Sequence, residues 1–419
     1  MRLTEDDLYR TSTQYKHWSF TPSQLAAQRR TTNIQASERV KAAVARQRAQ
    51  RSLLDASASE SERAGSGVEN GGDTPVRVDK EVNCLTVTEE KRLVDVFCAR
   101  ALDLGKFLKF PTEVTATGIQ FLRRFYLFNS PMTYEPQTIS PCAMFVANKV
   151  ENHGLPLERY VAVLPNMTTD KVLAPEYLLV QGLRFNFQVR HPFNGLKGGH
   201  LEMIEMARGN ANLLPNAEKT KEQLQQEMLQ LPRKPNGPAQ SLSVAQLEKR
   251  IENAYGFASI VLKGPAQLTD AYFLYTPSQI WFTAHLLADE PLTLFYLSAK
   301  VPTSPIHSKI ISTLRSCADL LSSHSSYTTD QISKEEKVAR EKKEKEEVSA
   351  LIKKAKHCRD PDKIDLVKLN LAQKRDAVAG GSLEESKAKR RKLEREGYQK
   401  ESDDFWGPEL KKANGAKVA

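Results

Sequence analysis

The sequence predicts an all-α protein with two similar helical domains in tandem, and three observations lead to that prediction. From Cys84 onward, apolar residues recur at helical spacing, as Leu93, Val96, Phe97 and Leu104 do. Proline stands at the start of successive apolar stretches, a position that a helix tolerates well. Two of these stretches also repeat one another, which a tandem arrangement explains.

The repeat joins two stretches that each begin with proline. The matching positions lie 141 residues apart and are Pro136, Ile139, Ala143 and Ala147 with their counterparts Pro277, Ile280, Ala284 and Ala288. Small residues at this spacing let neighbouring helices approach closely. A chance match between two proline-led amphipathic helices is the alternative.

The remaining segments differ in composition, and this predicts the order of the parts. Those parts are an N-terminal helical segment (1–54), a disordered linker (55–80), a first domain (81–190), a second domain (191–330) with a polar insert (209–242), and a charged C-terminal helix and tail (331–419). The linker is Ser-, Gly- and Glu-rich, so it buries too little apolar surface to offset its ordering entropy. The insert is either a long loop or a loosely attached helix around 221–231.

Within the first domain, two helix boundaries follow from local patterns. A cap at Thr88 is expected for the helix that carries Leu93. Residues 111–128 are apolar nearly all round, which predicts a central, buried helix. A further helix is expected over 175–187.

The net charge of +10 lies in the two flanking segments. Residues 1–60 hold 10 basic and 6 acidic residues, and residues 333–419 hold 24 and 18. The middle is therefore neutral, with 27 of each sign. A DNA-reading domain concentrates positive charge on its folded surface, so sequence-specific nucleic-acid binding is not expected.

Several other classes of protein are not expected either. The five cysteines are widely spaced and never form a C-x-x-C pair, which favours a reducing compartment and no zinc site. Neither a signal peptide nor a membrane-spanning run is recognisable, which predicts a soluble, intracellular protein. The catalytic motifs of ATPases, hydrolases, metalloproteases and kinases are absent from the sequence, so no catalytic residue, metal or cofactor is predicted.

Six segments carry a resemblance to a known family. They are KHWSF (16–20), EKRLVDVFC (90–98), FLRRFYLFNSPMTYEP (121–136), FVANKVEN (145–152), EYLLVQGLRFNFQVRHPF (176–193) and LTDAYFLYTPSQI (268–280). These segments resemble the cyclins, and within them the cyclin H type and its fungal counterparts. The resemblance implies two tandem five-helix cyclin boxes with flanking N- and C-terminal helices.

The resemblance also implies a kinase-binding role for particular residues. Lys149 looks like the cyclin-box lysine and Glu176 like its partner glutamate, which in the family hold the kinase's mobile regulatory helix inward. The implied kinase-facing side chains are Lys149, Glu176, Val146, Val180, Phe185 and Trp18. A charge on these apolar helices is costly unless it is paired, so pairing of Lys149 with Glu176 inside the fold is the alternative. The repeat equivalent of Lys149 is Glu290, which predicts that only the first box grips the kinase.

The implied function is that of a regulatory subunit and not of an enzyme. Similarity to cyclin H implies activation of a cyclin-dependent kinase that phosphorylates the RNA polymerase II C-terminal domain and cell-cycle kinases. It also implies a RING-finger assembly factor and the TFIIH core as partners. Another transcriptional cyclin, of the C or K type, and a TFIIB-like DNA-binding factor are the alternatives. The first-box helix reads EEKRLVDVFCARAL where cell-cycle cyclins carry M-R-x-I-L…W, so substrate docking through that motif is not expected.

Two further segments have open interpretations. Trp18 is either a structural anchor of a terminal helix or a partner contact. A basic run in the tail is either a solvated cluster or a nuclear localisation signal, and it predicts a nuclear protein; its residues are Lys387, Lys389, Arg390, Arg391 and Lys392.

Overall fold

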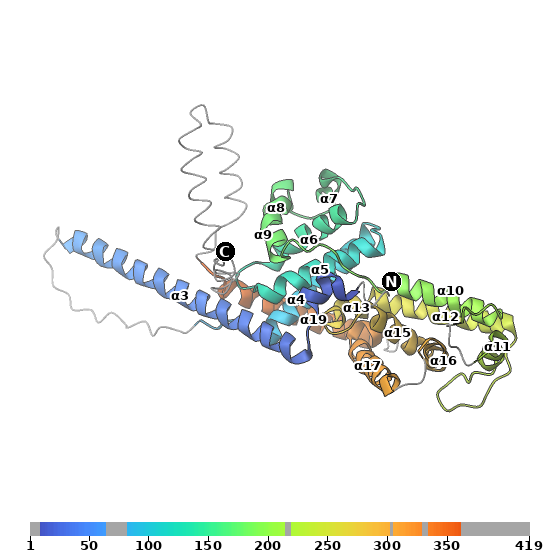
Figure 1. Ribbon diagram of the computed structural model, residues 1–419. Helices are drawn as coiled ribbons and strands as arrows, with labels where there is room; N and C mark the ends of the chain where they lie inside the picture. Colours follow the sequence, from blue (N-terminus) through green and yellow to red (C-terminus); the bar gives the residue numbers. More distant parts are fainter. Residues whose placement is uncertain (1–8, 64–81, 214–218, 302–304, 329–333, 362–419) are drawn as a thin grey trace, which may run out of the picture. The chain divides into compact units, whose positions relative to one another are not determined.

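The predicted all-α class is confirmed by the computed structural model. It describes residues 9–63, 82–213, 219–301, 305–328 and 334–361, and all regular secondary structure within these ranges is helical (Figure 1). The predicted basic run at 387–392 lies outside the described residues.

The helices fall into an N-terminal pair, two groups and a C-terminal helix. The N-terminal pair is α2 (Thr13–Trp18) and α3 (Pro22–Arg63). The first group is α4 (Val87–Phe107), α5 (Thr112–Phe128), α6 (Pro136–Val150), α7 (Leu157–Ala162), α8 (Thr169–Leu173) and α9 (Glu176–Gly182). The second group is α10 (Phe193–Ala207), α11 (Lys221–Leu229), α12 (Val244–Lys263), α13 (Pro265–Leu268), α14 (Ala271–Leu274), α15 (Pro277–Ala288), α16 (Glu290–Lys300), α17 (Pro305–Ser322) and α18 (Ser325–Thr328). The C-terminal helix is α19 (Lys334–His357).

The first group packs around α5, as the sequence predicts. Every α5 residue from Val114 to Leu127 is buried, and Phe121 and Phe125 are 0% exposed. At Gly118 the approach to α6 is so close that an added Cβ would lie 2.4 Å from the Met144 sulfur. Glycine therefore lets the central helix pack against its neighbour.

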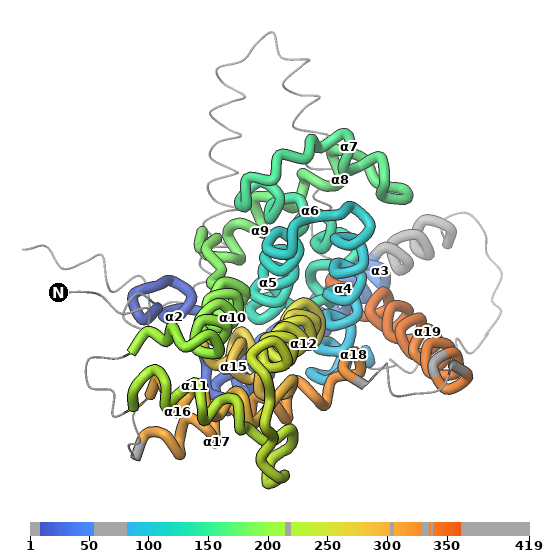
Figure 2. The backbone as a smooth tube through the Cα atoms, turned by 90° about the vertical axis from the view of Figure 1, so that its right-hand side faces the viewer, coloured from blue at the N-terminus to red at the C-terminus, as the bar shows by residue number. Residues whose placement is uncertain are grey.

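The repeated positions have the same structural role in both groups. Pro136 and Pro277 occupy the first turns of α6 and α15. Ala143 and Ala284 are both 0% exposed and lie in separate hydrophobic clusters; Ala147 is also buried, and Ala288 is half-buried against the second cluster. The second cluster is built on α10, α12 and α15 (Figure 2).

The N-terminal helix α3 docks by one narrow stripe of apolar residues, and it is longer than predicted. Its buried apolar residues are Leu25, Ala36, Val40 and Ala43. The helix continues to Arg63, so the prediction of a linker that starts at residue 55 is wrong for its first nine residues. Residues 55–63 contain Ala and Glu and no Gly or Pro, so nothing interrupts the helical backbone. The rest of the predicted linker, from residue 64, lies outside the described residues.

Two predicted helix boundaries are also wrong. The cap of α4 is Thr86 rather than Thr88, because Thr86 exchanges hydrogen bonds with Glu89 in a capping box. Helix α9 ends at Gly182 and not at 187. There the backbone turns left-handed at Arg184 and Phe185, with φ of 54° and 56°.

The polar insert holds a helix, which resolves the two alternatives left by the sequence. Helix α11 begins with a capping box between Thr220 and Gln223. It buries Leu224 and Met228 against the second cluster. Two apolar side chains one turn apart are enough to dock this otherwise polar segment.

Candidate functional site

Lys149 and Glu176 meet at the surface of the first group. Lys149 lies in the last turn of α6, Glu176 is the first residue of α9, and the Lys149 Nζ forms an ion pair with Glu176 Oε1. The side chains keep 44% and 29% of their surface exposed. The Nζ also lies 5.2 Å from the centre of the Phe145 ring. The pair is therefore solvated, and not the buried pair that the apolar neighbours in the sequence suggested.

Close packing beneath the pair fixes its place. Leu179 and Leu183 are 0% exposed and attach α9 to the first core. An added Cβ on Gly182 would lie 2.5 Å from the Phe125 ring, so α9 rests directly on α5. A short helix held this way presents Glu176 to α6 with little freedom.

The other predicted kinase-facing residues separate into exposed and buried ones. Phe185 is 58% exposed and Val180, one turn after Glu176, is half-buried. Val146 is only 3% exposed, so it belongs to the core and its side chain does not reach a partner. We call Lys149, Glu176, Val180 and Phe185 the α6–α9 surface.

The sequence reasoning missed one exposed aromatic residue beside this surface. Tyr177 is 53% exposed and follows Glu176 on α9. Its position in the helical repeat could have revealed this exposure. Leu179 and Leu183 define the inner face of α9, and Tyr177 does not lie on that face. An apolar run read as a whole hides this difference between faces.

Trp18 is a structural anchor, and its prediction as a partner-binding residue is wrong. Its side chain is 0% exposed and packs with Leu25, Leu127 and Phe273. The Arg124 guanidinium lies 5.1 Å from its ring centre. A residue enclosed on all sides cannot contact a partner while α2 stays in place.

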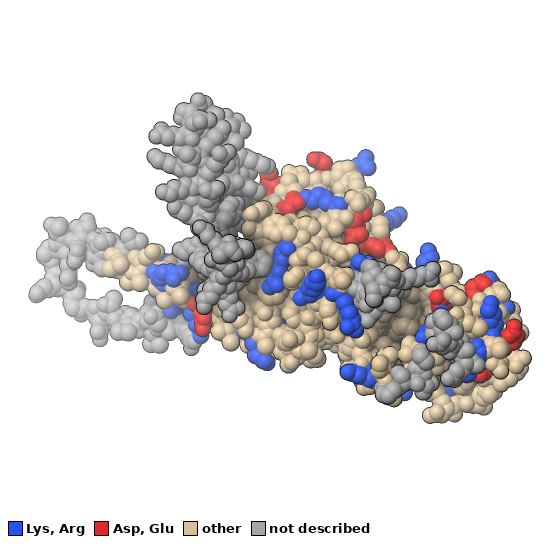
Figure 3. All heavy atoms as spheres, in the orientation of Figure 1, with Lys and Arg blue, Asp and Glu red and all other residues tan. Residues whose placement is uncertain are grey.

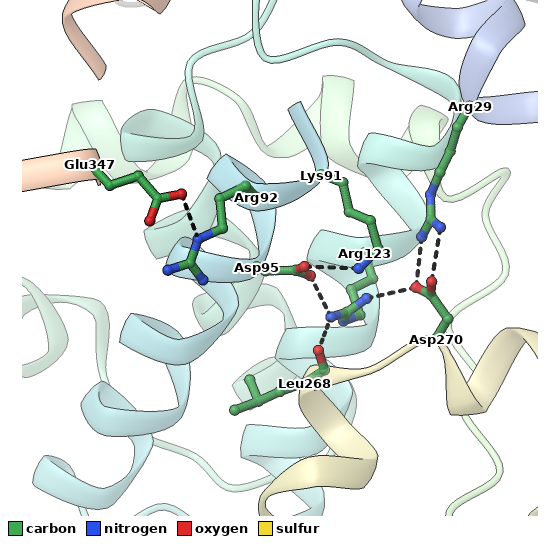
Figure 4. Close-up of polar contacts among 8 residues, drawn as sticks. All are labelled: Arg29, Lys91, Arg92, Asp95, Arg123, Leu268, Asp270 and Glu347. Atoms are coloured by element: carbon green, nitrogen blue, oxygen red, sulfur yellow. Dashed lines mark hydrogen bonds and ion pairs between the residues drawn. The ribbon is translucent and has the colours of Figure 1, made fainter. Parts of the chain in front are cut away.

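A second charged cluster joins α3 and both groups of helices (Figure 4). Asp270, just before α14, accepts two hydrogen bonds from Arg29 of α3, at 2.6 and 2.9 Å. Arg123 of α5 lies 3.1 Å from Asp270 and 2.6 Å from Asp95 of α4, and it also donates to the Leu268 carbonyl. The Arg123 side chain is 3% exposed, so this network is largely removed from water.

The described residues form neither a metal site nor a membrane-spanning helix. No group of three His, Cys, Asp or Glu side chains in the described ranges is placed to hold a metal ion. Of the described helices, none combines the length and apolar character that crossing a bilayer requires. On the face shown in Figure 3, basic and acidic side chains are interspersed among uncharged ones.

The chain is similar to known proteins of the cyclin family. Residues 191–322 match the family described as Cyclin C-terminal domain. Cyclin CCL1 of Saccharomyces cerevisiae is 29% identical over 303 residues, which are 72% of this chain and 63% of that protein. The chain is therefore similar to the cyclins. It is also similar to Cyclin-H1-1 of Arabidopsis thaliana, with 27% identity over 193 residues, 45% of this chain and 54% of that protein.

A solved structure extends the likeness to both boxes. A chain of the CAK complex of Chaetomium thermophilum bound to ATP-γ-S is 28% identical, with a TM-score of 0.64. The match covers 91% of the present chain and 98% of that one. The predicted similarity to the cyclin H type is thereby confirmed. The chain spans less than two thirds of the length of either curated relative.

The first half of α4, the helix that lacks the M-R-x-I-L motif, packs against α19 (Figure 2). Arg92 pairs with Glu344 at 2.8 Å, and Lys354 pairs with Glu89 at 2.7 Å. Leu93 of α4 is 2% exposed. Peptide docking on this face would first require displacement of the C-terminal helix.

Proposed function

We propose that this chain is a cyclin H-like regulatory subunit that binds and activates a cyclin-dependent kinase, and that it has no catalytic activity of its own. The observation that carries the proposal is the match to a chain of the CAK complex over 91% of this chain. The exposed α6–α9 surface provides a place for the kinase, since it combines an ion pair with a solvent-exposed aromatic residue.

Activation on this surface acts through helix placement. A protein kinase needs its β3 lysine and αC glutamate paired before the lysine aligns the ATP phosphates. A cyclin that contacts the mobile regulatory helix holds it inward and stabilises that arrangement. Lys149 and Glu176 offer opposite charges to that helix, and Val180 and Phe185 offer apolar contact.

The proposed assembly has further members. A RING-finger assembly factor and the TFIIH core are the partners proposed beyond the kinase, and the RNA polymerase II C-terminal domain and cell-cycle kinases are the proposed substrates of the complex. Co-purification of the tagged chain from its own cells, with mass spectrometry of the bound proteins, tests these memberships one by one.

Lys149→Glu is expected to weaken kinase binding while leaving the chain folded. Reversal of a charge that becomes desolvated in the complex costs about 2–5 kcal/mol, which raises the Kd roughly 30-fold to several-thousand-fold. In the free chain the pair is exposed, so its loss changes the free energy of unfolding by about 1 kcal/mol or less. Titration calorimetry with the purified kinase, beside chemical denaturation, measures both quantities.

Arg315→Glu is the matched control for this variant. Arg315 pairs with Glu290, the repeat equivalent of Lys149, at 3.3 Å, and it is 64% exposed. The same charge reversal in the second box should leave the Kd within about twofold, since surface substitutions outside an interface have small effects. Equal weakening by both variants would show that the effect is one of net charge and would remove the α6–α9 surface from the proposal.

We propose a nuclear location, carried by the basic run at 387–392. Replacement of Lys387, Lys389, Arg390, Arg391 and Lys392 by alanine should shift a fluorescently tagged chain to the cytoplasm. The control removes three exposed lysines of α19 instead, Lys342, Lys343 and Lys345, and should stay nuclear. Both variants are imaged in the Lys149→Glu background, so that a bound kinase does not import the chain. Nuclear fluorescence from the alanine variant in that background would show that the basic run is not the nuclear localisation signal.

A further inference from the structure

A chain of side-chain hydrogen bonds runs from the end of α6 to the second group of helices. Thr117 Oγ1 of α5 lies 2.6 Å from Glu151 Oε1 and 2.9 Å from His191 Nε2. His191 Nδ1 lies 3.0 Å from the Tyr272 hydroxyl, which lies 2.8 Å from Gln267 Nε2. Glu151 caps α6, His191 lies between the two groups, and Tyr272 and Gln267 belong to α14 and α13.

On the side of the second group of helices, the donor and acceptor of each hydrogen bond can be assigned. Gln267 Nε2 lies 3.1 Å from the Leu262 carbonyl, which only accepts, so this side of the amide is the donor. The same NH₂ group donates to the Tyr272 hydroxyl. The hydroxyl hydrogen of Tyr272 is then available to His191, so His191 Nδ1 is an acceptor without a proton.

On the side of the first group of helices, each hydrogen bond also donates in the direction from Tyr272 toward Glu151. The Glu151 carboxylate accepts from the Thr117 hydroxyl, which leaves the Thr117 oxygen to accept from His191. His191 Nε2 therefore carries the proton. Burial, with the nearby charge of Arg124, lowers the pKa of His191 to about 3, so the imidazole is neutral, as this order requires.

The row of hydrogen bonds ends at Glu151, next to the α6–α9 surface. Glu151 follows Lys149 by two residues, and its backbone N–H closes α6 on the Ala147 carbonyl at 2.9 Å. Thr117 is 0% exposed and Tyr272 is 3% exposed, whereas Glu151 and His191 are half-buried, so the two hydroxyl groups at either side of His191 are removed from water. A rotation of the His191 ring would break both of its hydrogen bonds at once, because the two partners lie on opposite ring nitrogens.

We propose that His191 is a positioning residue that couples the second box to the end of α6, and thereby to Lys149. The proposal rests on the proposed kinase-binding function for its consequence, but the coupling itself is a property of the free chain. Hydrogen bonds that share a polarised group strengthen one another, so the hydrogen bonds on the two sides of His191 act as one unit. The second group of helices then contributes to kinase binding, although it has no lysine at the position equivalent to Lys149.

A double-mutant cycle tests the coupling. Thr117→Val and Tyr272→Phe each remove one hydroxyl, on opposite sides of His191, and neither touches Lys149. Each alone should raise the Kd for the kinase roughly three- to tenfold, the scale of one lost hydrogen bond. The double variant should be no weaker than the weaker single variant, because one break already uncouples the boxes. Multiplication of the two effects would mean two independent contacts and would overturn the proposal.

Thr293→Val is the matched control. Thr293 is also a buried threonine bonded to a histidine, with its Oγ1 2.7 Å from His285 Nδ1, but this pair lies within the second box and away from α6. The control should lower stability as Thr117→Val does and leave the Kd unchanged. A Kd raised equally by Thr293→Val would show that general destabilisation, and not His191, is responsible.

Two measurements on the free chain keep this inference separate from the proposed function. Nitrogen-15 spectra should show the His191 proton on Nε2, and a proton on Nδ1 would contradict the assigned order. Amide hydrogen exchange at Glu151 should accelerate in Tyr272→Phe, whose substitution lies in the other box, and not in Thr293→Val. Unchanged exchange in Tyr272→Phe refutes the coupling, whereas accelerated exchange without kinase binding by any variant refutes only the proposed function.

Discussion

Asp270→Ala is expected to destabilise the fold by about 3–5 kcal/mol, because it leaves two arginines without their shared carboxylate in a largely buried network. Asp270 is 12% exposed and holds Arg29 by two hydrogen bonds and Arg123 by a third contact (Figure 4). The three residues come from the second group, α3 and α5, so one substitution loosens three parts of the molecule. Urea denaturation followed by circular dichroism measures the change.

Asp103→Ala is the control for charge removal. Asp103 pairs with Lys106 at 3.3 Å, and the two side chains are 75% and 68% exposed. An exposed pair of this kind contributes about 1 kcal/mol or less. Similar losses in Asp270→Ala and Asp103→Ala would contradict the assignment of the Asp270 network as a structural joint.

The same network predicts a pH dependence. Burial alone would raise the pKa of Asp270, but hydrogen bonds from Arg29 and the charge of Arg123 outweigh it and hold that pKa well below its usual range. A carboxyl group with a depressed pKa stabilises the fold above its unfolded-state pKa, and this stabilisation is lost as the pH falls through the folded-state value. The difference in stability between the native chain and Asp270→Ala should therefore shrink below about pH 4.

Trp18→Ala is expected to cost about 3–5 kcal/mol, the range for removal of a fully buried large aromatic side chain. Its ring is 5.9 Å from that of Phe128 and 5.1 Å from the Arg124 guanidinium, between α2 and α5. The cavity would weaken the attachment of the N-terminal helices, which thermal denaturation and limited proteolysis of α2 both detect.

Tyr15→Ala, in the same helix, is the control that distinguishes a structural role of Trp18 from a role in partner binding. Tyr15 is 43% exposed, so its removal should change stability by about 1 kcal/mol or less. If Trp18→Ala instead kept the native stability and weakened kinase binding, Trp18 would be a partner contact and the burial argument would fail.

The helices themselves were largely predictable from the sequence. Apolar spacing placed the central helix over 111–128, and the structure has α5 at Thr112–Phe128. Errors arose where two local signals compete, as at Thr86 and Thr88, where the glutamate three residues ahead decides which threonine is the cap. The end of α9 was missed because apolar residues continue past the left-handed turn at Arg184.

The candidate site was predictable only in part. The motifs pointed to Lys149 and Glu176, but not to their exposure, because an apolar sequence neighbourhood describes the inner face of a helix as well as its rim. Val146 was assigned to the surface and lies in the core, since one helical step separates the two faces. Tyr177 was missed for the same reason.

By itself, the sequence determined what depends on residues a few positions apart: helix periodicity, proline starts and the repeat that places Ala143 and Ala284 in equivalent positions. Only the tertiary structure decided which distant polar groups meet. Arg29 and Asp270 are 241 residues apart, and Thr117 and His191 are 74 apart. A helix is stabilised by hydrogen bonds four residues apart, so its signal is local, whereas these contacts exist only after separate helices have packed.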